Sequence, residues 1–186
     1  MVNTFVFMGR PGSGKGVQTE ILAAKLGSKV FSTGKRLRDI AKEDSVLGRK
    51  VGKILDSGDL VPSWLASFLF GEVFLSLNNK EVIIFDGIGR QESEAKLFAE
   101  ICDWLGRDFQ VINLDVSEKT VTGRINKRHV VEDRTDDDNI QDRFTKYNTQ
   151  TMPALNFFRS IGKVIDIDGE PLPDIVAAEI QEKLRG

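Results

Sequence analysis

Short apolar runs alternate with longer amphipathic stretches along this chain. Apolar runs bounded by turn residues are typical of buried strands, and apolar positions repeating every three to four residues are typical of helices. Strands separated by helices indicate an α/β fold with a five-stranded parallel sheet and helices on both of its faces. The predicted strands cover residues 2–8, 29–31, 81–85, 109–115 and 163–167. The predicted helices cover residues 14–26, 33–42, 46–55, about 62–77, 92–104, 118–127, 139–159 and 172–184.

Local signals refine this outline. Gly58 is expected to end the helix before it, and Pro62 to lie in the first turn of the next helix. Pro153 is expected to kink or break the helix 139–159, because proline has no amide hydrogen. The densely charged residues 128–138 predict a loop that includes His129. The helix after Pro62 is predicted to have one strong apolar face, made of Trp64, Leu65, Phe68, Leu69, Val73 and Leu77.

A glycine-rich loop follows the first predicted strand. Residues 9–16 read Gly-Arg-Pro-Gly-Ser-Gly-Lys-Gly, and a strand, a Gly-x-x-x-x-Gly-Lys loop and a helix in that order are typical of a phosphate-binding loop. The glycines allow backbone N–H groups to converge on an anion, the helix N-terminus favours negative charge, and Lys15 adds a cation. A plain glycine-rich turn is the alternative. Gly16 stands where a Ser or Thr hydroxyl commonly binds Mg²⁺.

Length and composition limit the possible functions. A chain of 186 residues with 40% hydrophobic and 29% charged residues suits one soluble globular domain. A net charge of −2 argues against nucleic acid as the main partner. No membrane-spanning run and no secretory leader are visible, so a cytoplasmic location is expected. Cys102 is expected to be a buried structural thiol. The only histidine, His129, argues against a histidine metal site or a Ser-His-Asp hydrolase.

Charged residues near the predicted strand ends suggest a site for more than one phosphate. A surface arginine is usually a solvated charge, but a site that brings two phosphate-bearing ligands together needs several cations, and the planar guanidinium binds phosphate oxygens in pairs. Asp86 follows an apolar strand and precedes Gly87, where phosphate-loop enzymes hold the Mg²⁺ shell; an ordinary Asp-Gly turn is the alternative. The candidate arginines are Arg38, Arg90, Arg124, Arg128, Arg134 and Arg143.

With these motifs in order, the chain resembles the adenylate kinase family of nucleoside monophosphate kinases over essentially its whole length. In that family a glycine after the loop lysine is normal. The other matching segments are Phe31-Ser32-Thr33-Gly34-x-x-Leu37-Arg38, Gly58-x-Leu60-Val61-Pro62, Asp86-Gly87-x-x-Arg90, Arg124-x-x-x-Arg128, Arg134-x-Asp136-Asp137, Arg143-x-x-x-Tyr147-x-x-x-Thr151-x-Pro153 and Asp168-Gly169.

The resemblance implies a P-loop NTPase-type three-layer fold in a single domain, residues 1–186. Its core would comprise residues 1–32, 80–127 and 139–186. A helical monophosphate-binding insertion would cover about residues 33–79. A short lid would cover about residues 128–138, and because these residues include no cysteine, the lid would hold no zinc.

The implied activity is reversible, Mg²⁺-dependent transfer of a phosphoryl group from ATP to a nucleoside monophosphate, with AMP favoured and two ADP as products. A kinase for GMP, CMP, UMP or a deoxynucleotide, and a weakly active nucleotide-binding homologue, are the alternatives. A GTPase switch is disfavoured because of Gly16 and because the chain has no Asn-Lys-x-Asp motif. ATP and Mg²⁺ are the expected ligands, the chain is expected to be a monomer, and neither nucleic acid nor a membrane is expected as a partner.

Site residues follow from the resemblance, position by position. Lys15, Arg90, Arg128, Arg134 and Arg143 would be catalytic, and Asp86 would hold Mg²⁺ through water. No general base is expected, because the attacking phosphate oxygen is already largely ionised. The ATP side would comprise Gly12, Ser13, Gly14, Lys15, Gly16, Val17, Arg124, Arg128, Gly169 and Pro171. The monophosphate side would comprise Thr33, Arg38, Asp59, Leu60, Val61, Gly87, Arg90, Glu94, Arg134 and Arg143.

Some positions depart from the family pattern. Val17 stands where Thr is usual, Lys35 replaces an acidic residue, and Ile88-Gly89 replaces an aromatic-Pro pair that would hold Arg90 rigidly. The spacing from Asp137 to Arg143 is also short, which weakens the assignment of Arg143 to the transferring phosphate.

Glu94 replaces the Gln that reads adenine. Gln presents a donor and an acceptor, whereas an ionised Glu presents acceptors only. Glu94 would therefore suit either the adenine amino group or the two adjacent donors of guanine, and the family resemblance favours AMP.

Overall fold

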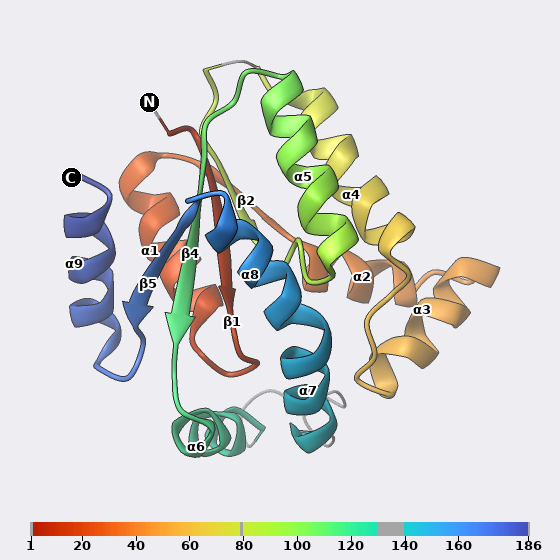
Figure 1. Ribbon diagram of the computed structural model, residues 1–186. Helices are drawn as coiled ribbons and strands as arrows, with labels where there is room; N and C mark the ends of the chain where they lie inside the picture. The colour runs from red at the N-terminus through yellow and green to blue at the C-terminus, as the bar shows by residue number, and fades with distance from the viewer. Residues whose placement is uncertain (1, 79, 130–139, 186) are drawn as a thin grey trace.

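Five parallel strands form the centre of the computed structural model (Figure 1). The strands are β1 (Thr4–Gly9), β2 (Lys29–Ser32), β3 (Ile83–Asp86), β4 (Phe109–Asp115) and β5 (Val164–Asp168), and they lie side by side in the order β2-β3-β1-β4-β5. Every pairing is parallel, so the predicted sheet is confirmed. The structure describes residues 2–78, 80–129 and 140–185, without the side chains of 127–129.

Alternating side chains of the central strand supply two separate cores. Phe5 and Phe7 pack against α1 (Lys15–Leu26) and α9 (Pro173–Lys183) on one face of the sheet. Val6 and Met8 face the other side, where α5 (Glu92–Trp104) and α8 (Met152–Ser160) cover the sheet. Both faces of the central strand are thus buried, which explains why residues 5–8 form an uninterrupted apolar run.

Phenylalanines dominate the second of these cores. Phe98 of α5 lies with its ring centroid 5.3–6.3 Å from those of five others, and most of these pairs meet edge to face. Cys102, one turn further along α5, is fully buried, and burial raises the pKa of its thiol to about 12. The prediction of a buried structural thiol is confirmed. The five partners of Phe98 are Phe70, Phe74, Phe85, Phe109 and Phe158.

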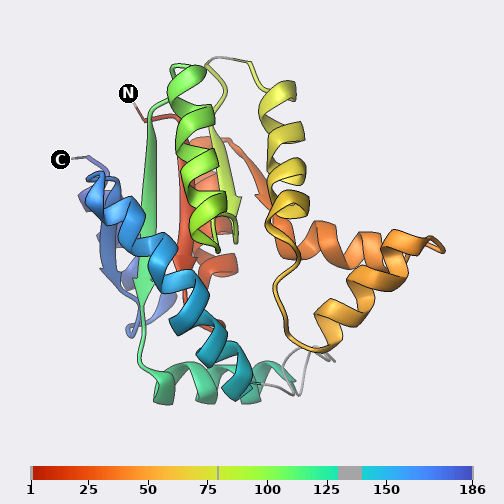
Figure 2. The ribbon, with the colours of Figure 1, turned by 45° about the vertical axis from the view of Figure 1, so that its right-hand side comes forward.

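Three helices lie between β2 and β3. They are α2 (Thr33–Ala41), α3 (Val46–Asp56) and α4 (Ser63–Ser76). Ser32 caps α2 and Ser45 caps α3, each accepting a backbone N–H of the first turn with its hydroxyl oxygen. In Figure 2, α2 and α3 extend away from the sheet, whereas α4 runs alongside α5. These three helices bury a core of their own around Leu37, Val51 and Leu69.

The predicted apolar face of α4 is wrong in part. Leu65 and Leu69 are buried as expected, but Trp64 and Phe68 are 65% and 57% exposed. This helix is apolar on nearly every side, so its residue spacing could not select the buried face. Tertiary contacts select the face that contains Leu65, Ala66, Leu69, Phe70 and Phe74.

The C-terminal helical stretch is interrupted as Pro153 predicts. It consists of α7 (Ile140–Lys146), a π-helical turn η2 (Tyr147–Thr151) and α8. In the π turn the N–H of Met152 donates to the carbonyl of Tyr147, five residues earlier. The wider turn comes directly before Pro153, which has no N–H to donate.

The other predicted boundaries need small corrections. Helix α6 (Glu118–His129) continues through Arg128 and His129, which were predicted to lie in the charged loop. Pro62 is the N-cap of α4 and precedes its first turn, whereas Gly58 follows the end of α3 with a left-handed φ of 63°, as expected. Among the described residues, no helix combines the length and apolarity needed to cross a membrane.

Candidate active site

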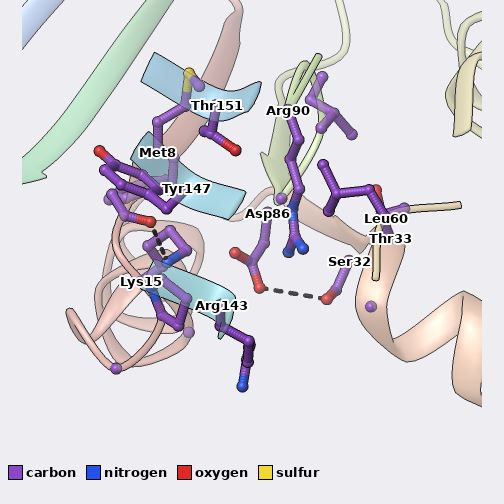
Figure 3. A pocket seen from close by; sticks show the side chains of 18 of the residues that line it. Met8, Lys15, Ser32, Thr33, Leu60, Asp86, Arg90, Arg143, Tyr147 and Thr151 are labelled. Atoms are coloured by element: carbon purple, nitrogen blue, oxygen red, sulfur yellow. Dashed lines mark hydrogen bonds between the residues drawn. The ribbon is translucent and has the colours of Figure 1, made fainter. Parts of the chain in front are cut away.

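A cavity of about 590 Å³ opens at the carboxyl ends of β1 and β3. Its walls come from the glycine loop, the start of α2, the residues 58–61 between α3 and α4, and the helical stretch of α7 and η2. In Figure 3, Lys15, Asp86, Arg90 and Arg143 lie around this one space. Crevices at the carboxyl ends of parallel strands are the usual ligand sites of α/β sheets.

The glycine loop requires its glycines and ends on Lys15. Gly9, Gly12 and Gly14 have φ values of 138°, 83° and 95°, which residues with a Cβ rarely adopt. A Cβ on Gly12 would lie 2.8 Å from Cγ1 of Ile125. Lys15 opens α1, and its ammonium donates hydrogen bonds to the carbonyls of Gly9 (2.8 Å) and Arg10 (2.9 Å). This ammonium therefore stays beside the loop, where it can meet an anion that the loop binds.

Two arginines connect this loop to neighbouring segments. Arg124 of α6 donates to the carbonyl of Ser13 (3.3 Å) and to those of Gly169 (2.9 Å) and Glu170 (3.0 Å). Arg10, which the sequence reasoning did not single out, donates to the carbonyl of Val116 (3.2 Å), and its guanidinium lies 5.4 Å from the centre of the Tyr147 ring. The glycine loop is thereby joined to three other parts of the chain.

Asp86 ends β3 at the cavity. Its Oδ2 accepts a hydrogen bond from the hydroxyl of Ser32 at 3.3 Å (Figure 3). Among the described residues no group of three or more His, Cys, Asp or Glu side chains could enclose a metal. Mg²⁺ does not need such a group, because it binds through one or two carboxylates, water and substrate phosphates. The oxygen ligands at Asp86 therefore fit this ion.

The turn after β3 carries Arg90. Gly87 and Gly89 have left-handed φ values of 78° and 62°. A Cβ on Gly87 would lie 2.5 Å from NH2 of Arg90, so the guanidinium folds over this glycine. The backbone N–H of Arg90 donates to Oε2 of Glu94 at 2.9 Å. Glu94 lines the cavity but is only 2% exposed. Burial raises the pKa of its carboxyl group, although hydrogen bonds from Arg90 and Gln91 act in the opposite direction.

Polar groups from α2 and α7 complete this side of the cavity. Thr33 is 5% exposed, and its hydroxyl finds no hydrogen-bond partner within the described parts of the chain. Asp59 accepts from the ammonium of Lys146 at 2.7 Å and from the hydroxyl of Ser57 at 2.7 Å. The hydrogen bond from Lys146 is the main reason that the pKa of Asp59 lies below its ordinary value.

Most predicted site residues meet at this cavity. Ser13 is buried, and neither it nor Gly169 and Pro171 lines the space, although Ser13 and Gly169 both bind Arg124. Arg134 lies outside the described residues. Arg128 lies in α6, without a described side chain. The predicted residues that line the cavity are Gly12, Gly14, Lys15, Gly16, Val17, Thr33, Arg38, Asp59, Leu60, Val61, Asp86, Gly87, Arg90, Glu94, Arg124 and Arg143.

Several residues that also line the cavity were given no role from the sequence, among them the polar side chains of Lys146, Tyr147 and Thr151. Tyr147 and Thr151 were nonetheless part of the motif that begins at Arg143, four residues apart and therefore on one side of a helix. Lys146 precedes that tyrosine and has the charge opposite to that of Asp59. These were the signals available in the sequence.

A parallel sheet with a Gly-x-x-x-x-Gly-Lys loop between β1 and α1 defines a P-loop protein that binds nucleotide phosphates. Comparison with known families narrows the class of protein further. The family model described as adenylate kinase matches residues 7–163. The chain belongs to the adenylate kinase family.

Individual relatives agree with this assignment. A protein named adenylate kinase from Thermus thermophilus is 35% identical over 182 residues, covering 96% of this chain and 95% of the relative. One from Bacteroides fragilis is 36% identical over 172 residues, covering 91% and 90%. One from Leptospira biflexa is 34% identical over 167 residues, covering 88% and 90%. The similarity thus extends over nearly the full length of both chains.

Proposed function

We propose that this chain is an adenylate kinase that transfers the γ-phosphoryl group of ATP to AMP and forms two ADP. The observation that carries the proposal is one cavity lined both by the glycine loop with Lys15 and by Arg90 with residues 59–61. Two phosphate-bearing substrates need such a shared space. The family assignment supports the same reaction.

The proposed donor side is the glycine loop. Its amides and Lys15 would bind the β- and γ-phosphates of ATP, and Arg124 would lie against the adenine and phosphates of the donor. The ammonium of Lys15 donates hydrogen bonds to the carbonyls of Gly9 and Arg10. When ATP binds, these neutral acceptors would be exchanged for charged phosphate oxygens. Asp86 would hold Mg²⁺ through water, and the ion would supply positive charge that offsets the charge of the phosphates.

The proposed acceptor side faces it across the cavity. Arg38 and Arg90 would clamp the phosphate of AMP, while Thr33, residues 59–61 and the region of Glu94 would surround its base. An oxygen of that phosphate attacks the γ-phosphorus, the bond to the β-phosphate oxygen breaks, and ADP leaves. Positive charge from Arg128, Arg134 and Arg143 would stabilise the transferring group, and no proton needs to be removed.

The remaining assignments are also proposals. The insertion, about residues 33–79, would bind the monophosphate, and the lid, about residues 128–138, would close over the substrates and exclude water. Most of the lid lies outside the described residues. The monomeric state and the cytoplasmic location stay predictions.

A coupled assay tests the reaction. ATP and Mg²⁺ are supplied with AMP, GMP, CMP, UMP or dAMP, and diphosphate formation is followed. We expect the highest kcat/KM with AMP. A preference for another monophosphate would correct the acceptor. ATP binding without turnover on any acceptor would instead identify a nucleotide-binding homologue. The departures at Val17, Lys35, Gly89 and Glu94 motivate this alternative.

A further inference from the structure

The turn that carries Arg90 is anchored by Ile88, which is 1% exposed and packs in the same core as Phe98, but a glycine stands on each side of that anchor. Both Gly87 and Gly89 have left-handed φ values, and glycine has the widest conformational freedom of any residue. Proline, with φ fixed near −65°, could not adopt the φ of 62° found at Gly89. Gly89 separates the buried Ile88 from Arg90, so the position of Arg90 also depends on contacts beyond the turn.

Glu94 provides such a contact. It is the third residue of α5, and its Oε2 accepts the N–H of Arg90 at 2.9 Å. Glutamate at the third position of a helix commonly accepts the N–H of the N-cap residue, which here is Gln91; Glu94 accepts the N–H of Arg90, one residue earlier. The helix N-terminus favours its negative charge. Since Glu94 is 2% exposed, little water competes for the bond.

Gln91 extends the contact to the segment that lines the acceptor side. Its Nε2 donates to Oε1 of Glu94 at 3.2 Å and to the carbonyl of Val61 at 3.0 Å. Val61 is 5% exposed and belongs to residues 59–61 of the cavity wall. A continuous chain of hydrogen bonds thus runs from the backbone of Arg90 through Glu94 and Gln91 to Val61.

We propose that Gln91 and Glu94 are positioning residues, which hold Arg90 and residues 59–61 at a fixed separation matched to the acceptor's phosphate and base. The inference rests on the proposed function. Both carboxylate oxygens of Glu94 already accept hydrogen bonds from the protein, so its effect passes through Arg90 and Val61. If the hydrogen bonds of Glu94 and Gln91 are lost, the binding of every monophosphate therefore weakens by the same factor, whichever base it carries.

The test compares Gln91→Leu and Glu94→Gln with a control, Glu92→Gln. Leucine at 91 removes both hydrogen bonds of the amide, and glutamine at 94 turns an NH₂ group toward the NH₂ group of Gln91. The control removes an equal charge from the same helical turn, where the partner of Glu92 is Lys96 at 2.7 Å. KM is measured for ATP and for each acceptor that the wild type uses. AMP binding is measured by calorimetry, and thermal unfolding checks the fold.

We expect both link variants to raise the KM and Kd for AMP about tenfold, as for loss of one hydrogen bond near a charged group. We expect the KM of other acceptors to rise by that same factor, with KM for ATP changed less than about twofold and the control close to wild type. An unchanged ratio between the KM values of different acceptors distinguishes positioning from base reading. A residue that reads the base would change the ratio of KM for AMP to KM for GMP.

Three results overturn the inference: an unchanged Kd for AMP in Gln91→Leu, an altered ratio between acceptors in Glu94→Gln, or an equal rise in KM for ATP. If Glu94→Gln does not fold, the Kd for AMP of the Gln91→Leu variant decides the question alone, because Gln91 is partly exposed and its replacement disturbs the core less. A wild type without turnover refutes the proposed function, and the Kd values for AMP still test the link. A wild type that binds no monophosphate refutes both.

Discussion

The ion pair between Lys146 and Asp59 joins the segment before α4 to α7. Removing this pair should weaken the binding of AMP and leave that of ATP unchanged. We predict that Lys146→Met raises KM for AMP about fivefold and leaves KM for ATP unchanged. Methionine retains most of the apolar stem, so the packing of α7 is preserved. The variant loses the bond to Oδ1 of Asp59 at 2.7 Å and the bond to the carbonyl of Ser57 at 3.1 Å.

The magnitude follows from exposure. The two side chains are 22% and 51% exposed, so the pair itself is worth about 0.2–1 kcal/mol, as other ion pairs at surfaces are. The hydrogen bond to Ser57 adds about 0.5 kcal/mol at such an exposed site. A total near 1 kcal/mol corresponds to about fivefold in an equilibrium constant.

A double-mutant cycle with Asp59→Asn measures the coupling. We expect KM for AMP to be nearly the same in Lys146→Met and in the double variant, because the second change removes a partner that is already lost. High salt should move the wild type toward the variants, since the pair is partly exposed. Strictly additive effects, or a rise in KM for ATP in place of AMP, would show that the pair does not hold the acceptor segment.

The charge state of Asp59 sets the pH range of this experiment. Its pKa lies below the ordinary 3.8 because Lys146 binds the ionised form. A lowered folded-state pKa means that the stabilisation is complete above 3.8 and is lost as the pH falls through the lower folded value. Assays near neutral pH therefore measure the intact pair.

Other predictions concern the donor loop, the core and a loop carboxylate. Val17→Thr restores a hydroxyl at a side chain that is 48% exposed, so it should lower KM for ATP about threefold to fivefold without changing the unfolding midpoint; an unchanged KM would mean that this position does not meet the phosphates. Phe98→Ala should lower the free energy of unfolding by about 3–5 kcal/mol in urea titrations, because five phenylalanines lose their common partner; a loss below about 1 kcal/mol would contradict the packing. Hydrogen bonds from Thr120 and Ser117 lower the pKa of Glu170 to about 2. The stability that the ionised carboxylate adds to the fold is therefore complete above the ordinary pKa of 4.5 and is lost as the pH falls through about 2. Carboxyl NMR shifts measure that pKa, and a midpoint near 4.5 would refute the assignment.

Local signals in the sequence were sufficient for much of the fold. Apolar runs indicated the five strands, most clearly the central β1, β3 and β4, which are buried on both faces of the sheet. Pro153 marked the interruption of the C-terminal helix, although the π turn that accommodates it could not be deduced from one residue. The apolar face of α4 could not be deduced either, because Trp64 and Leu65 are equally apolar and only the neighbouring helices distinguish them.

The sequence by itself determined the kind of chemistry. The glycine loop with Lys15, the Asp86-Gly87 step and the arginines identify phosphate binding, because each depends on residue type and on spacing along a short stretch of chain. Only the tertiary structure decided how the acceptor side is held together. The contact of Glu94 with Arg90 is local, but those of Gln91 with Val61 and of Lys146 with Asp59 depend on where different elements meet. The last two join residues that are 30 or more positions apart, a proximity that spacing along the chain does not encode.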